Sequence, residues 1–261
     1  MPLLHREIKR AFESYEFVPH FQPIVDLQKG ETHGFEILAR WIHPLQGLLT
    51  PDLFIAAMEE RRQANHLTSV LLEQAFPLIL SKKIPLHLSI NVSPSQLLDR
   101  DLPDLMQRAA EHTGFPLSRV SIELTENALI TDLESARKAV TRLEQLGLDL
   151  ILDDFGTGYS SLLYLQSLPF KGLKIDRSFV SRASDSTQAR KIIAGVIALA
   201  QSLNLSTVAE GIETQEQEQI VRECGCTFGQ GFLYGCPSAD PSISCEQTMA
   251  SAGLVGSRNN R

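Results

Sequence analysis

Cysteine is scarce in this sequence, and its spacing does not suit a metal site. The 261 residues contain four cysteines, all late in the chain: Cys224, Cys226, Cys236 and Cys245. Zinc sites usually space paired ligands by about two to four residues, and no histidine pair accompanies these cysteines. Reduced thiols, as in a cytoplasmic protein, are therefore the expected state.

Long apolar runs and an excess of positive charge are also missing. The longest nearly unbroken apolar run, 192–200, is about half of a bilayer span, and residues 1–12 are mixed and charged. We therefore expect no signal peptide, no membrane contact from this domain and a cytoplasmic location. The net charge of -7 argues against polymeric nucleic acid as a partner, and a phosphate ligand would need metal ions.

What the sequence does contain is an alternation of short apolar runs with longer segments of helical period, which is typical of an α/β protein. The expected strands are 17–27, 33–42, 86–92, 120–125, 148–155, 172–176, 206–212 and 227–234. The expected helices are 51–60, 67–81, 102–113, 132–146, 160–167, 188–203 and 214–223. Eight strands predict a TIM-barrel-like (β/α)8 barrel. Because only residues 28–32 separate the first two strands, the first should run antiparallel to the rest.

The domain boundaries follow from length and composition. A single α/β barrel routinely occupies about 200 to 250 residues, and no linker is visible before Ser251, although two smaller domains also fit the length. We expect one barrel over residues 1–250 and a disordered tail over 251–261, which is small, polar and unpatterned.

Capping residues mark several helix ends. Thr131 with Glu134, and Thr214 with Gln217, have the spacing of capping boxes at helix starts. Gly114 and Gly147 are expected to end helices.

Acidic and amide residues stand at or near the ends of five expected strands. They are Glu36, Asn91, Glu123, the pair Asp153 and Asp154, and Glu210. Buried carboxylates are costly unless they are paired, hydrogen-bonded or bound to a cation, and barrel enzymes keep their active sites at the carboxyl ends of the strands. One shared site therefore explains the set better than separate salt bridges. Oxygen ligands without His or Cys favour Mg2+ or Mn2+, and the adjacent aspartates suit a two-metal site.

Lys174 lies in an expected buried strand and admits two interpretations. It could pair structurally with Asp176 or with a helix terminus. It could instead face the carboxylates and hold an attacking water or stabilise charge on phosphoryl oxygens. The segment that follows the acidic pair, 155–161, carries Gly156 and Gly158 but lacks the Gly-Lys-Ser/Thr ending of a P-loop, so we expect a mobile loop.

Together these residues resemble the EAL domain family, which hydrolyses cyclic di-GMP to linear pGpG. The resemblance covers about residues 8–237, in ordered blocks at 21–25, 34–41, 91–93, 123–126, 153–161, 173–176, 209–213 and 230–232. In the family's signature Ile37 replaces alanine, so that the motif reads Glu-Ile-Leu. On a strand Ile37 should alternate away from Glu36 and face the packing, which leaves the chemistry intact.

The resemblance implies a role for each matching residue. The first metal would be held by Glu36, Asn91, Glu123 and Asp153, with Asp153 bridging to a second ion that Asp154 anchors. Glu36, Lys174 and Glu210 are implied in catalysis, with Lys174 positioning water and Glu210 acting as general base or serving the second metal through water. Gln22, Leu38 and Arg40 resemble substrate contacts, and Gln230 resembles a residue that closes the pocket. Glu126, Glu213 and Asp176 are expected around the glycine-rich loop and the site.

The resemblance also implies cofactors and partners. Mg2+ or Mn2+ should support turnover, whereas Ca2+ should bind without supporting it, because it accepts longer bonds and a looser geometry. A homodimer bordered by the 155–161 loop is expected, and members are often fused to a sensor or GGDEF domain.

Two other functions stay open from the sequence. Some members of the family have lost catalytic acids and bind cyclic di-GMP as receptors, although no ligand position is missing here. A barrel hydrolase acting on another phosphodiester is the second alternative. The sequence lacks the His-Asp pairs of the other common cyclic di-GMP phosphodiesterase class.

Overall fold

The computed structural model describes residues 2–60, 62–125, 132–156 and 165–241. The strands are β1 (Phe17–Asp26), β2 (Glu31–His43), β3 (Gly47–Leu49), β4 (His87–Asn91), β5 (Val120–Thr125), β6 (Asp149–Phe155), β7 (Gly172–Ile175), β8 (Ser206–Ala209) and β9 (Phe228–Gln230). The α-helices are α1 (Pro2–Glu13), α2 (Ile55–Glu60), α3 (Ala64–Leu80), α4 (Pro94–Leu97), α5 (Leu102–Thr113), α7 (Leu133–Gln145), α9 (Arg177–Val180), α10 (Thr187–Ser202) and α11 (Gln215–Glu223). Two 3-10 turns, η1 (Pro51–Leu53) and η2 (Leu117–Arg119), complete the described elements.

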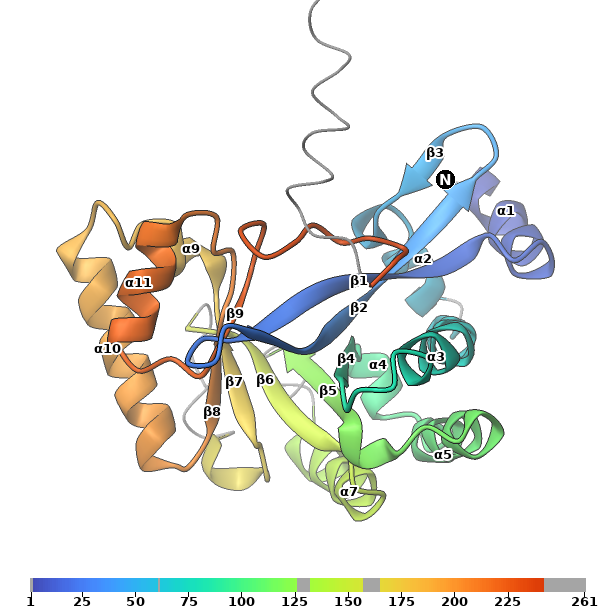
Figure 1. Cartoon of the computed structure of the whole chain (residues 1–261). Coiled ribbons are helices and arrows are strands. Elements are labelled where there is room, and N and C mark those ends of the chain that lie inside the picture. The colour runs from blue at the N-terminus through green and yellow to red at the C-terminus, as the bar shows by residue number, and fades with distance from the viewer. Residues whose placement is uncertain (1, 61, 126–131, 157–164, 242–261) are drawn as a thin grey trace, which may run out of the picture.

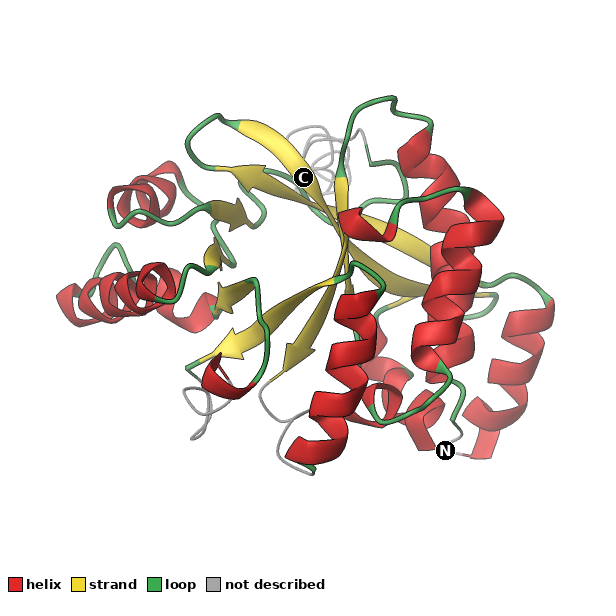
Figure 2. Cartoon of the chain, turned by 90° about the horizontal axis from the view of Figure 1, so that it is seen from below, coloured by secondary structure: helices red, strands yellow, loops and turns green. Residues whose placement is uncertain are grey.

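The strands close into a barrel with helices outside it (Figures 1 and 2). The hydrogen-bonded order is β1-β9-β8-β7-β6-β5-β4-β2-β3, and a further pairing of β1 with β2 closes the ring. Strands β2 and β4 to β9 run parallel to one another, whereas β1 is antiparallel to both of its neighbours, β2 and β9. The predicted TIM-barrel-like fold with a reversed first strand is confirmed.

All eight predicted strands are present, but the last two are shorter than predicted. Strand β8 ends at Ala209 and β9 at Gln230. The chain turns out of the sheet at Gly211, whose φ is 68°, and at Gly231, which lies against the backbone of Ile212. Strand β3 and helix α1 were not predicted. They lie together beyond one end of the β1–β2 hairpin (Figure 1).

The predicted helices are largely confirmed, with two corrections. The expected helix 51–60 is interrupted at Phe54, where φ is -137°, and so forms η1 and α2. The N-cap of α7 is Asp132, one residue after the predicted Thr131, and its carboxylate accepts a hydrogen bond from the Ser135 amide. The expected helix 160–167 lies mostly outside the described residues, as do Thr131 and the tail 251–261.

The other predicted helix ends are found where expected. Thr214 and Gln217 form the capping box of α11, with reciprocal side-chain and backbone hydrogen bonds. Gly114 ends α5 with a φ of 76°, and Gly147 follows α7 with a φ of 89°.

The core continues beyond the barrel to hold the hairpin and α1. Trp41 and Phe17, opposite each other on β2 and β1, have ring centroids 5.3 Å apart, and Phe54 packs 5.6 Å from Phe17. The Trp41 indole donates to Glu16 at 2.8 Å, so its buried N–H has a partner. Ile8 of α1 is fully buried in the same cluster. Among the described helices, none is both long and apolar enough to cross a membrane.

We expect Gly231→Ala to destabilise the protein, because its Cβ would lie 2.2 Å from the Ile212 oxygen. Overpacking of this kind costs about 1–3 kcal/mol or more, which would lower the thermal midpoint by several degrees. Thermal unfolding followed by circular dichroism would measure the change.

Gly195→Ala is the matched control for that experiment. Gly195 lies exposed inside α10, and nothing stands within 4 Å of its Cβ position. The same substitution should stabilise there by roughly 0.5–1 kcal/mol, since alanine is the better helix former. Equal midpoints for the two variants would contradict the packing argument.

Candidate functional site

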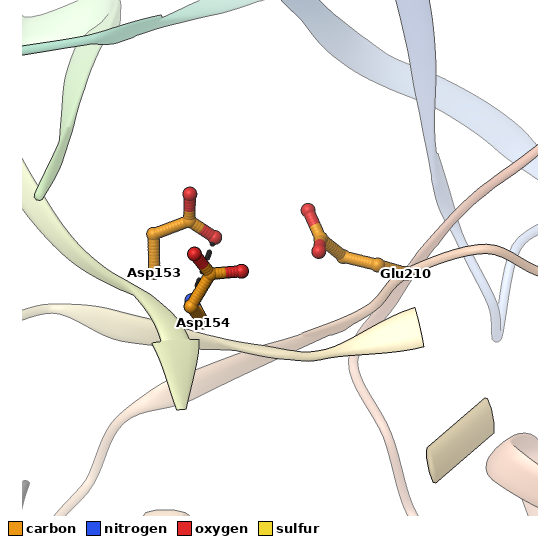
Figure 3. A group of neighbouring side chains, drawn as sticks. All are labelled: Asp153, Asp154 and Glu210. Atoms are coloured by element: carbon orange, nitrogen blue, oxygen red, sulfur yellow. Dashed lines mark hydrogen bonds between the residues drawn. The ribbon is translucent and has the colours of Figure 1, made fainter. Parts of the chain in front are cut away.

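An irregularity in β6 brings two adjacent aspartates into one space. The pairing of β6 with β7 shifts between Leu152 and Phe155, and Asp154 has a φ of 57°. On a regular strand neighbouring side chains point to opposite faces, and this bulge removes that alternation. The Asp154 amide donates to the Asp153 carboxylate at 2.9 Å. Figure 3 shows both carboxylates turned toward Glu210, which follows β8.

Lys174 lies at the centre of the predicted acid cluster and is only 1% exposed. Its Nζ atom is 2.6 Å from Glu210 and 2.7 Å from Glu123. It is also 3.3 Å from Glu36 and 3.7 Å from Asp153. These acids come from four elements of the barrel, so one ammonium group joins strands that are far apart in sequence. Of the two positions expected for Lys174, the structure shows the one in which its side chain faces the carboxylates.

Amide side chains complete the hydrogen bonding of Glu36. Asn91 donates its Nδ2 to one Glu36 oxygen at 2.6 Å, and Gln230 donates its Nε2 to the other at 2.5 Å. The same Gln230 nitrogen lies 3.1 Å from the Gln22 oxygen. Three residues predicted from separate blocks therefore meet at or beside Glu36: Asn91 from β4, Gln22 from β1 and Gln230 from β9.

Burial and charge move the pKa values of these groups in opposite directions. Burial raises the pKa of Glu123 well above its usual value, and the neighbouring Glu36 adds to the rise. Burial is also the main reason that the pKa of Glu210 is raised to about 7; Lys174 lowers this pKa, while Asp153 and Glu36 add to the rise. For Glu36 burial acts upward, but Lys174, Gln230 and Asn91 together lower its pKa. The carboxylates hold the pKa of Lys174 well above its usual value against the effect of burial.

The geometry of the acids fits a divalent cation. Asp153, Asp154 and Glu210 each offer a carboxylate oxygen, and these oxygens all lie within 4.8 Å of one another. Burial raises the pKa of Asp154, as do Asp153 and Asp176, which is the repulsion that a bound cation would relieve. Oxygen-only donors of this kind suit hard ions.

Two hollows open beside the cluster, and three of the predicted substrate contacts, Gln22, Leu38 and Gln230, line them. One, of about 310 Å³, is lined by Gln22, Glu36, Glu210 and Gln230. The other, of about 450 Å³, is lined by Leu38, Asn91, Asp52 and Thr125. Arg40 is buried and donates to the Ala39 carbonyl at 2.8 Å. Burial lowers the Arg40 pKa while Glu36 and Asp52 act to raise it, which places this guanidinium near the acids.

Ile37, which replaces alanine in the family's motif, packs in the core, as predicted.

The remaining predicted residues are divided between the site and local structure. Glu213 lines the smaller hollow. Asp176 caps α9 by accepting the Ser178 amide, so its first role is structural. Glu126 and most of the 155–161 loop lie outside the described residues. Arg177 and Phe232 also line the smaller hollow and were not predicted as site residues, although Phe232 is the last residue of one motif block and Arg177 directly follows another.

A closed α/β barrel with an acid cluster at the carboxyl ends of its strands defines a class of cation-binding barrel proteins. Comparison with known proteins gives the family. The sequence matches the EAL domain over residues 5–237, and the chain belongs to that family. It is 38% identical over 238 residues to the cyclic di-GMP phosphodiesterase NbdA of Pseudomonas aeruginosa, covering 90% of this chain and 30% of that protein.

Solved structures agree with this assignment. The fold is similar to that of the PaMucR phosphodiesterase in complex with c-di-GMP, with a TM-score of 0.85 and 33% identity over 94% of this chain and 99% of that one. It is also similar to Klebsiella pneumoniae BlrP1, solved with c-di-GMP and calcium or manganese. For BlrP1 the TM-score is 0.76 and the identity 29%, over 85% of this chain and 56% of that one. The chain spans about a third of the length of the first curated relatives that it matches.

Without metal, we expect Glu210→Gln to gain stability relative to the wild type as pH rises. The folded-state pKa of Glu210, about 7, exceeds the usual 4.5, so the stability linked to its protonation is present below about pH 4.5 and lost as pH approaches 7. Glutamine stays uncharged throughout, so the variant should gain up to about 3 kcal/mol. Denaturant titrations in a chelator at a series of pH values would measure this difference.

The difference between variant and wild type is the useful quantity, because buried histidines titrate in the same range. Burial lowers the pKa values of His33 and His87, and their contribution to stability changes with the opposite sign. Glu73→Gln, at an exposed position on α3, is the control and should show no such gain. A pH-independent difference for Glu210→Gln would contradict the raised pKa.

Proposed function

We propose that this domain hydrolyses cyclic di-GMP to the linear dinucleotide pGpG in a reaction that requires divalent cations. The observation that carries the proposal is the gathering of Asp153, Asp154 and Glu210 within reach of one another beside a buried lysine. Membership of the EAL family and the activity named for its relatives support the choice of substrate.

Mg2+ or Mn2+ would be held by Glu36, Asn91, Glu123 and Asp153, with Asp153 and Asp154 serving a second ion. Bound cations of this kind neutralise charge on a phosphodiester and lower the pKa of water. The Asn91 Nδ2 donates to Glu36, which leaves the Oδ1 atom of the amide as its cation-binding end. Manganese in a BlrP1 complex supports this choice of ion.

The side chains themselves supply proton transfer and charge stabilisation. A carboxyl group with a pKa of about 7, as Glu210 has, can accept a proton from water near neutral pH at its Oε atoms. Lys174 remains charged, because its pKa is raised, and can donate hydrogen bonds to water or to a phosphoryl oxygen. Its ion pairs with four acids hold the Nζ atom in place without reorganisation.

The two hollows suit the two halves of a cyclic dinucleotide. Glu36 lines one of them, and its neighbours Ile37 and Leu38 line the other. Arg40 can bind a phosphate or a guanine edge through its planar guanidinium, and Gln22 and Gln230 can donate and accept hydrogen bonds. We further propose a homodimer bordered by the 155–161 loop, a cytoplasmic site of action and fusion to a sensor or GGDEF domain.

Turnover should require the acid cluster. With Mg2+ or Mn2+ the protein should convert cyclic di-GMP to pGpG, and Glu36→Gln should lower kcat by at least about a hundredfold, because it removes a ligand charge and a partner of Lys174. Product chromatography measures the rate. Glu73→Gln is the control with unchanged turnover, and a chelator should abolish the wild-type reaction. Wild-type turnover in Glu36→Gln would sink the assignment of Glu36.

Replacing Mg2+ by Ca2+ should separate binding from hydrolysis. Ca2+ accepts longer bonds and more ligands than Mg2+, so it should still join protein to phosphate while aligning the attacking water poorly. Calorimetry with cyclic di-GMP in Ca2+ should show binding, and turnover should fall by about two orders of magnitude or more. Binding in both ions without turnover in either would favour a receptor.

A further inference from the structure

The opposite mouth of the barrel, where the parallel strands begin, contains a cavity that the proposed reaction does not use. It measures about 290 Å³ and is lined by residues from most of the barrel strands. TIM barrels usually fill this region with bulky branched side chains. Here several inward positions are small, including Gly34, Ser89, Ser121 and Ser206. The cavity therefore exists because small side chains occupy these inward positions.

Aromatic rings form one wall of this cavity, and a second bulge puts the middle ring there. Strand β1 pairs Ile24 with Gly34 but Val25 with Thr32, so His33 has no partner in the ladder. The His33 ring stacks between His87 and Phe228, with 4.4 Å between centroids on each side. Alternation along β2 would otherwise send His33 to the face opposite Gly34.

Polar groups enter the cavity at its depth and at its rim. Ser89 is 4% exposed, and its Oγ atom has no hydrogen-bond partner among the residues that the structure describes. Asp149 and Lys171 lie at the outer end of the lining. At the inner end Glu123 lines the cavity while its carboxylate is paired with Lys174. A buried hydroxyl without a partner is a group that a ligand could satisfy.

We propose that this cavity is a second ligand site, for a small, uncharged, planar heteroaromatic molecule of about the size of a purine base. The volume lies near the lower end for ligand pockets, and a mostly apolar lining with a few polar atoms is typical of them. Stacked aromatic rings on one wall and Ile24, Ile151 and Val208 around the rest favour a flat ligand. Ser89 supplies one hydrogen bond.

The charges around the cavity argue against an anionic or a cationic ligand. Burial, with His87 nearby, lowers the pKa of His33 to about 4, so that its ring is neutral at pH 7. Glu123 is already compensated by Lys174. An anion or a cation in the cavity would therefore be desolvated without a counter-charge at its inner end, which is unfavourable.

The test is histidine-ring NMR of the full chain with selectively labelled histidine, titrated with adenine and with benzimidazole. The His33 and His87 ring signals, assigned from His33→Gln and His87→Asn, should move as a planar ring enters. We expect a Kd between roughly ten micromolar and one millimolar for a ligand of about ten non-hydrogen atoms. Orotate, which is planar but anionic, should leave both signals unchanged.

Ser89→Leu should fill the cavity and weaken binding at least tenfold, whereas Ser202→Leu, at an exposed position on α10, should not. Should Ser89→Leu fail to fold, crystals of the wild type soaked in 8-bromoadenine would locate the ligand by the anomalous signal of bromine. Ring shifts that survive in Ser89→Leu, an anomalous peak confined to the carboxyl-end mouth, or no shift with either neutral probe would each overturn the proposal.

Discussion

The carboxyl-end mouth of this barrel depends on one buried ammonium group. Lys174 compensates carboxylates that reach it from β2, β5, β6 and the end of β8, and each partner alone would be costly to bury. Burial acts to raise the pKa of both Glu36 and Glu123, but Lys174 and two amide donors lower that of Glu36, whereas Glu36 adds to the rise at Glu123. One ammonium group thus faces four acids. The cluster therefore remains short of positive charge, which is the electrostatic condition that favours a divalent cation.

Two bulges determine which side chains reach the barrel interior. The irregularity in β6 turns Asp153 and Asp154 toward the same space, and the bulge in β2 places His33 at the opposite mouth. In both cases the strict alternation of a strand is broken by one residue, and the exception supplies a group with hydrogen-bonding capacity. Bulges commonly lie next to functional sites, and here each mouth of the barrel has one.

The reversed strand adds a constraint on how the barrel closes. Strand β1 is antiparallel to both β2 and β9, and Gln22 and Gln230 meet Glu36 across these two pairings. The pairings of β1 with β2 and β9 therefore close the barrel and also bring Gln22 and Gln230 to the site. Gly231, the residue after Gln230, lies against the backbone of Ile212. This close contact fixes the position from which the Gln230 side chain reaches the site.

The sequence alone determined the eight barrel strands, most of the helices and the acids that gather in one cluster. Apolar periodicity and the short 28–32 connection predicted eight strands with the first one reversed, because these signals are local in the chain. Acids at strand ends predicted a shared cluster, since burial without partners is costly. Only the tertiary structure decided how the cluster is arranged. Of its two expected positions Lys174 takes the one that faces the acid cluster, Asp153 and Asp154 turn toward the same space, and His33 turns into the opposite mouth. These outcomes depend on the register between strands and on bulges, which arise from contacts between residues distant in sequence and leave no periodic signal in any one segment.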